Sequence, residues 1–345
     1  MFSVVDWLID VSFRPSRHTY DPHNTACVIT QGQNVIVRKQ IEFFNKKNQK
    51  LQGSLWYDRS SAIPKNCLLY LHSLGTNQFE CLDLVPFMCS PDLCLFAFDF
   101  PGCGISEGDY IPLDGNGVYD VESAIKHLDE SFHFEKHCLW GRSMGAAISL
   151  HCASVMNSIT CCVSDSAYKD TKAVVYDQAE LNGIPSFIVT LIVPVIKYKA
   201  QRTLGTDVIS QSPMDKVPFS STPLLMGHGK QDSFVTISQA RNLFDLYGCP
   251  DKQLYIFDAM HNTNRPYQWY ETASRFIHRK LGLAPVMKYY DSVSNSASIH
   301  SGLFEQIIED IDNKIREAKE EQQMKKIELN STAPTEIFIG TLNSE

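Results

Sequence analysis

The sequence lacks a CxxC pair and a basic stripe, and each absence excludes a class of protein. The 345 residues carry a formal net charge of -8, which argues against the phosphate backbone of a nucleic acid as the main partner. The 11 cysteines are an odd number, and several lie in apolar runs where thiols act as small hydrophobes. This cysteine usage favours a reducing compartment, and we expect a cytoplasmic protein. No His or Cys cluster has metal-ligand spacing, so neither a metal nor a cofactor is predicted.

Long apolar segments are also missing. The first residues have no basic start, apolar stretch or small-residue cleavage site, so they do not predict a secretion signal. The longest apolar run, residues 184–196, contains two prolines and is shorter than the roughly 20 residues that a spanning helix needs. We therefore expect no transmembrane segment.

From about residue 66, short apolar runs alternate with longer amphipathic stretches. This alternation is typical of strand, crossover helix and strand in a mostly parallel sheet. The predicted parallel strands are residues 67–71, 93–98, 137–140, 160–164, 223–226 and 253–257, each a nearly continuous apolar run as expected of a strand buried on both faces. Before them, residues 35–44 and 52–57 predict an antiparallel hairpin at the sheet edge. The sequence predicts one α/β domain over residues 1–285.

Two further segments accompany this domain. Residues 168–217 are too long for a simple crossover, and we interpret them as a short cap of one or two helices; the alternative is a long crossover helix that packs on the sheet. Beyond the domain, a Ser-rich linker (286–301) leads to an amphipathic helix (302–327) and a tail (328–345) that we expect to be disordered. The apolar face of that helix could pack on the domain, pair with another chain or lie on a membrane.

A Gly-x-Ser-x-Gly pattern, GRSMG, occupies residues 141–145. By chance such a pattern arises in roughly one chain of this length in ten, so its context decides its meaning. It directly follows the strand predicted at 137–140 and opens a helical stretch at 144–150, which is the strand, turn and helix arrangement of a nucleophile elbow. The glycines permit the sharp turn that presents the Ser143 hydroxyl at the C-terminal edge of the sheet. Ser143 is therefore the candidate nucleophile.

A serine nucleophile needs an imidazole base and a carboxylate that orients the base, in the chain order Ser, acid, His. Asp232 follows the strand at 223–226, and His261 follows the strand at 253–257. Because the C-terminal ends of parallel strands meet at one edge, we expect both side chains to reach Ser143.

Other acids and histidines fit these positions less well. Asp251 lies before its strand, and Asp258 is interpreted as a strand-end carboxylate because it lies so close to His261. His151 falls within the predicted helix after Ser143, and His228 precedes the acid, so we interpret both as structural histidines.

Attack on a carbonyl creates an oxyanion, which two backbone N–H groups can stabilise. Met144, directly after the nucleophile, is the first predicted donor. The second should come from the loop after the first parallel strand, where Leu74 is the preferred donor and Ser73 the alternative.

Three runs carry a family resemblance: FRPSRHTY at residues 13–20, DFPGCGISEG at 99–108 and LWGRSMGA at 139–146. They resemble the branch of the α/β hydrolases that contains serine aminopeptidase-like proteins and protein depalmitoylases. The run at 99–108 is interpreted as structural, since it lacks the third glycine of a phosphate-binding loop. The chain differs from the membrane-anchored depalmitoylases because its first cysteine is Cys27, whereas those proteins share an N-terminal cysteine cluster.

This resemblance implies the α/β-hydrolase fold and an esterase, thioesterase or peptidase that uses Ser143, Asp232 and His261. The expected substrate is a small acyl or peptide compound, and the apolar run at 184–196 favours an apolar acyl chain. The favoured activity is that of an acyl esterase or thioesterase. The alternatives are a serine aminopeptidase-like peptidase and a non-catalytic interaction protein with this fold.

Overall fold

The structure is a computed structural model that describes residues 14, 17–22, 27–31, 34–60, 63–111, 115–181, 183, 185–204 and 212–284. The linker, helix and tail predicted between residues 286 and 345 lie outside the described residues.

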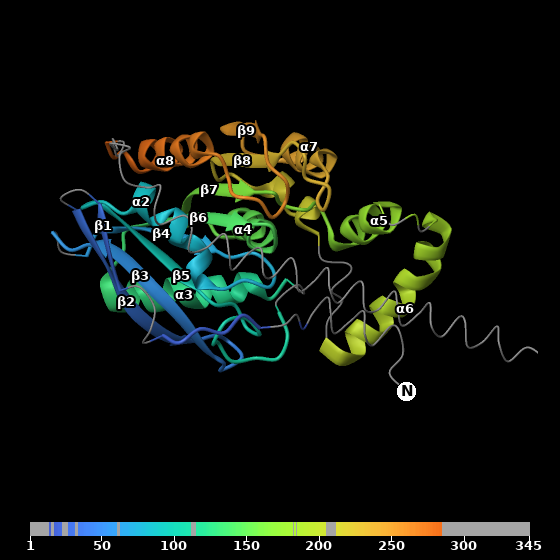
Figure 1. The fold of residues 1–345 in the computed structure, drawn as a ribbon, viewed down its shortest axis with the longest axis horizontal. Helices are drawn as coiled ribbons and strands as arrows, with labels where there is room; N and C mark the ends of the chain where they lie inside the picture. The colour runs from blue at the N-terminus through green and yellow to red at the C-terminus, as the bar shows by residue number, and fades with distance from the viewer. Residues whose placement is uncertain are drawn as a thin grey trace, which may run out of the picture. The chain divides into compact units, whose positions relative to one another are not determined.

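Within the described ranges, nine strands form one sheet in the order β1-β2-β3-β5-β4-β6-β7-β8-β9 (Figure 1). The pairs β1–β2, β2–β3 and β3–β5 are antiparallel, whereas the strands from β5 to β9 pair in parallel. The predicted, mostly parallel sheet is confirmed. The strands are β1 (Val28–Gln31), β2 (Asn34–Phe44), β3 (Lys50–Asp58), β4 (Asn66–Leu71), β5 (Leu93–Phe98), β6 (Lys136–Arg142), β7 (Ile159–Asp165), β8 (Leu224–Gly229) and β9 (Lys252–Phe257).

Helices cover both faces of this sheet. Successive side chains of a strand point to opposite faces, so Leu69 of β4 joins the buried cluster under α3, α4 and α7, and its neighbour Leu68 joins the cluster under α2 and α8. Figure 1 shows α3 and α4 on one face and α2 and α8 on the other. The helices are η1 (Gln78–Asp83), α2 (Val85–Met88), α3 (Gly117–Phe132), α4 (Met144–Val155), α5 (Thr171–Leu181), α6 (Ser186–Leu204), η2 (Pro213–Asp215), η3 (Val217–Phe219), α7 (Ile237–Leu246) and α8 (Tyr267–Leu281).

Two sequence predictions about the sheet edges were wrong. The β2–β3 hairpin does not form the edge, because β1 pairs with β2 outside it and β3 pairs with β5 inside it. At the other end, β9 was predicted to be buried on both faces, but it is the last strand and only Phe257 in it is buried. An edge strand has a neighbour on one side only, so part of its apolar surface stays accessible.

In the described residues, the insert between β7 and β8 consists of the α-helices α5 and α6 and the short 3-10 helices η2 and η3. The side chains of α5 bond to the segment that follows β8: Gln178 donates to the Phe234 carbonyl at 3.1 Å, and Asp177 accepts from Thr236 at 2.9 Å and from Gln239 at 2.7 Å. The insert therefore lies against the loop that carries Asp232. Among the described helices, none combines the length and apolar character that a membrane crossing requires.

Candidate active site

Ser143 occupies a tight turn between β6 and α4. Its φ of 51° and ψ of -112° are unusual for a residue with a side chain, and its N–H donates to the Asp165 carbonyl at 2.8 Å. A Cβ on Gly145 would lie 1.9 Å from the Leu71 carbonyl oxygen, and one on Gly141 would lie 2.0 Å from the Gly145 carbonyl oxygen. Neither glycine can carry a side chain without displacing the backbone, so both glycines of the pattern are required by close packing.

The structure brings the three predicted residues together. The Ser143 Oγ lies 2.9 Å from the His261 Nε2, and the His261 Nδ1 lies 2.7 Å from the Asp232 Oδ2. Ser143 comes from the end of β6, and the other two follow the ends of β8 and β9, as the chain order predicts. All three residues are buried.

The Asp232 carboxylate is held by backbone groups of its own loop. Its Oδ1 accepts from the N–H groups of Phe234 at 3.0 Å and Val235 at 2.8 Å, which leaves Oδ2 for His261. The buried His228 donates from Nε2 to the Val235 carbonyl at 2.8 Å, and burial lowers the pKa of its imidazole. His228 therefore has the structural role that the sequence predicts, because it supports the loop around the acid.

A buried ion pair fixes the loop of His261. Arg265 contacts both carboxylate oxygens of Asp165, with distances of 2.9 to 3.0 Å, and also donates to the carbonyls of Met260 and Thr263. Burial raises the pKa of Asp165, but the charge and hydrogen bonds of Arg265 outweigh it and hold this pKa below its usual value. Because Asp165 also accepts from the Ser143 N–H, one residue connects the loops of nucleophile and base.

The loop after β4 carries the two alternative oxyanion donors. The Ser73 N–H already donates to the Glu80 carboxylate at 2.7 Å, and the Ser73 carbonyl accepts from the His72 Nδ1 at 2.8 Å. The His72 Nε2 in turn accepts from the Phe100 N–H at 3.1 Å. The Ser73 N–H is therefore engaged elsewhere, and Leu74 stays the predicted donor from this loop.

Arg142 joins that loop to the loop of His261. Its guanidinium donates to the His261 carbonyl at 3.1 Å and lies 3.9 Å from the Glu80 carboxylate, which holds Ser73. Burial lowers the pKa of Arg142, but the negative charges of Glu80 and Asp165 raise it by more than burial lowers it. The net shift of this pKa is upward. The guanidinium therefore stays charged between the two loops.

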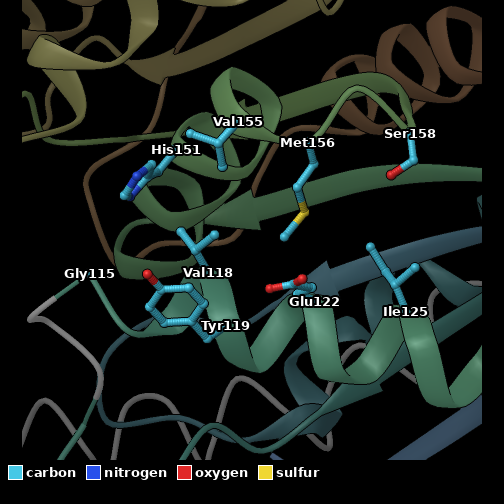
Figure 2. Close-up of a pocket in the computed structure, with 9 residues that line it drawn as sticks. All are labelled: Gly115, Val118, Tyr119, Glu122, Ile125, His151, Val155, Met156 and Ser158. Atoms are coloured by element: carbon cyan, nitrogen blue, oxygen red, sulfur yellow. The ribbon is translucent and has the colours of Figure 1, made fainter. Parts of the chain in front are cut away.

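Asp258, Asp251 and His151 have partners or surroundings other than the triad. Asp258 is exposed and accepts from Gln231 at 3.3 Å, whereas Asp251 precedes β9 and pairs with Lys280. His151 lies in α4, as predicted, and lines a cavity of about 480 Å³ between α3 and α4. Figure 2 shows His151 and Tyr119 on opposite sides of this cavity. None of the residues that line it belongs to the triad.

Four charged residues around the triad were missed from the sequence: Glu80, Arg142, Asp165 and Arg265. For two of them, the position in the sequence could have indicated a place near the site. Arg142 is the variable residue next to Ser143, and Asp165 is a polar residue at the C-terminal end of a predicted strand. Glu80 and Arg265 lie outside the strands and motifs identified above, where a single sequence does not distinguish a buried charge from an exposed one.

The sequence is similar to those of several known proteins. No family model matches the sequence. The human protein ABHD12B is 24% identical over 58% of this chain, and the match spans only 55% of its own length. YfhR of Escherichia coli O157:H7 is 24% identical over 65% of this chain and 73% of its own. Human alpha/beta hydrolase domain-containing protein 17B is 22% identical over 69% of this chain and 75% of its own length.

Solved structures share the fold. The esterase Pf2001 of Pyrococcus furiosus has a TM-score of 0.57 at 19% identity, over 70% of this chain and 91% of its own. Acetyl xylan esterase 1 of Thermoanaerobacterium has a TM-score of 0.54 at 14% identity, over 73% of this chain and 85% of its own. At these identities the likeness concerns the arrangement of the sheet and helices alone.

Proposed function

We propose that this chain, which belongs to the α/β-hydrolase superfamily, is a serine esterase that cleaves acyl esters through a Ser143 acyl-enzyme. The observation that carries the proposal is the continuous contact from Ser143 Oγ through His261 to Asp232, at 2.9 and 2.7 Å. A purely structural serine has no need of a buried imidazole and carboxylate in this order.

The first half of the reaction forms the acyl-enzyme. The Ser143 Oγ attacks the ester carbonyl carbon while the His261 Nε2 accepts the hydroxyl proton. The carbonyl oxygen becomes an oxyanion, which the N–H groups of Leu74 and Met144 stabilise. The bond from carbon to the leaving oxygen then breaks, and His261 returns the proton to the departing alcohol.

The second half releases the acid. A water molecule gives a proton to the His261 Nε2 and attacks the acyl carbon, which regenerates the oxyanion. When the bond to Ser143 breaks, His261 protonates the Oγ and the carboxylic acid leaves. Asp232 keeps the Nδ1 proton on His261 throughout, so that Nε2 is free to accept the proton in both halves.

Apolar side chains around the triad support an acyl substrate. Leu74, Phe234 and Met260 are exposed, and they lie on the three loops that carry an oxyanion donor, the acid and the base. The Phe234 ring lies 4.9 Å from the His261 ring, measured between centroids. An acyl chain that enters beside these residues would cover apolar surface that water now contacts. The names of two structural neighbours, both esterases, agree with this substrate class.

A fluorophosphonate probe tests the proposal, since it reacts only with an activated serine. We expect labelling of the wild type, no labelling of Ser143→Ala, and unchanged labelling of Ser154→Ala, a matched change elsewhere on α4. A folded wild type that stays unlabelled would favour the non-catalytic interaction protein instead. Faster hydrolysis of an anilide than of the nitrophenyl ester with the same acyl group would favour the peptidase.

Arg142, which connects the loop of Ser73 and Leu74 with the loop of His261, is the subject of a second prediction. We expect Arg142→Met to lower kcat by about 10- to 100-fold, because small displacements of catalytic groups have effects of this size. KM should change by less than about threefold, since the oxyanion contacts form only in the transition state. Steady-state kinetics measure both values.

The matched control for that change is Arg142→Lys, which keeps a positive charge beside Glu80 but cannot reach both loops as a guanidinium does. It should lose less activity than the methionine variant. Equal kcat values for wild type and Arg142→Met would show that Arg142 does not position the site.

A further inference from the structure

Helix α6 presents apolar side chains on two opposite faces. On one face, Val189 and Val193 are buried. On the other, Phe187, Leu191, Val195 and Tyr198 are exposed, with exposed fractions between 46% and 71%. Apolar faces of a helix are normally covered by protein or lipid, whereas these four side chains of α6 are exposed.

The exposed residues form one continuous stripe. Their spacing of four, four and three residues places them within an arc of about 80° of the helix surface, over a length of about 17 Å. Arg202 follows Tyr198 by four residues, so it continues the stripe by one turn. Its guanidinium lies 5.8 Å from the centre of the Tyr198 ring and donates to the Tyr198 hydroxyl at 3.3 Å.

The charged residues of the segment that contains α6 have one sign. Residues 181–206 contain no Asp or Glu, although the whole chain has 39 of them. Lys197 and Arg202 supply positive charge at the C-terminal half of the helix. A net negative protein thus has a local segment that is apolar and basic, the composition of helices that lie in the interface of a membrane.

We propose that the exposed face of α6 docks on the surface of a lipid membrane that contains anionic lipids. Phe187, Leu191 and Val195 insert at the boundary between headgroups and acyl chains, while Lys197 and Arg202 contact the negative headgroups. The helix lies along the surface and does not cross it. This binding does not depend on the reaction at Ser143, so an inactive enzyme docks equally well.

Vesicle sedimentation of the full chain tests this proposal. The vesicles contain phosphatidylcholine with about 30% phosphatidylserine, at about 0.15 M salt. We expect the wild type and Ser143→Ala to sediment alike, and the double variant Phe187→Gln/Leu191→Gln to bind about tenfold or more weakly. The matched control, Phe219→Gln/Leu246→Gln, changes exposed residues of the same types outside α6 and should bind as the wild type does.

The basic residues are tested separately. Lys197→Gln/Arg202→Gln should lower binding to the anionic vesicles by about fivefold per charge and leave binding to pure phosphatidylcholine unchanged. Thermal melting followed by circular dichroism verifies that each variant is folded.

Three results would overturn the proposal. The first is a wild type that does not sediment with the vesicles. The second is equal binding by the wild type and the Phe187→Gln/Leu191→Gln variant, which would place any membrane contact outside α6. The third is a dimer in gel filtration that this double variant dissociates, which would make a second copy of the chain the occupant of the stripe.

Discussion

Asp232→Asn is expected to lower kcat by about 10⁴-fold while the protein remains folded. The reason lies in the contacts of the carboxylate. Two backbone N–H groups, from Phe234 and Val235, point at Oδ1, so an asparagine keeps its carbonyl oxygen there and turns its NH₂ group toward His261. The His261 Nδ1 must then accept a hydrogen bond, which moves the ring proton to Nε2. In that tautomer the imidazole cannot take the proton of Ser143.

Initial rates on a nitrophenyl ester measure this loss, and Asp258→Asn is the matched control. Asp258 lies three residues before His261, but its side chain is exposed and accepts a hydrogen bond from the equally exposed Gln231. Its kcat should stay within about twofold of the wild type. A large loss in Asp258→Asn with full activity in Asp232→Asn would assign the acid to the other residue.

Arg265→Met should lower the free energy of unfolding by about 3 to 5 kcal/mol, because it leaves the Asp165 carboxylate buried without its partner. The side chains of this pair have exposed fractions of 1% and 2%. Arg275→Met is the matched control, since the Arg275–Glu271 pair is exposed and should contribute less than about 1 kcal/mol. Urea denaturation gives both values.

Acid should reduce the difference between the wild type and Arg265→Met. The pKa of Asp165 is lower in the folded protein than its ordinary value of 3.8, so the pair contributes fully above that pH. As the pH falls from 3.8 toward the folded pKa, the unfolded state binds the proton first and the contribution is lost. An Arg265→Met variant as stable as the wild type at neutral pH would contradict the assignment.

Much of the fold could be predicted because buried parallel strands leave a clear pattern. The run at 93–98 matches β5 residue for residue, since both faces of that strand are covered and every side chain is apolar. The edge strands of the sheet were harder to predict. Strand β1 has four residues, and its pairing with β2 depends on backbone hydrogen bonds that composition does not reveal. The apolar run of β9 predicted a fully buried strand, although β9 pairs with another strand along one edge only.

The same contrast holds for the candidate site. Ser143, Asp232 and His261 could be predicted because each follows a recognisable strand, and topology brings strand ends together. Glu80 could not, because its position depends on the three-dimensional path of a 3-10 helix that returns its carboxylate to Ser73. Contacts between residues far apart in the chain are set by packing, and local pattern does not encode them.

The insert of α5 and α6 lies between Lys169 and Met214, and the Met214 N–H donates to the Lys169 carbonyl at 3.1 Å. Its two ends are therefore fixed at neighbouring points, whatever the number of residues between them. The entropy of closing such a loop grows only slowly with its length. Among the described residues, the bonds to the loop of Asp232 come from α5. The part of the insert that contains α6 can therefore change in length or surface while the bonds among Ser143, Asp232 and His261 stay as they are, and new binding properties can evolve there without a change in the catalytic residues.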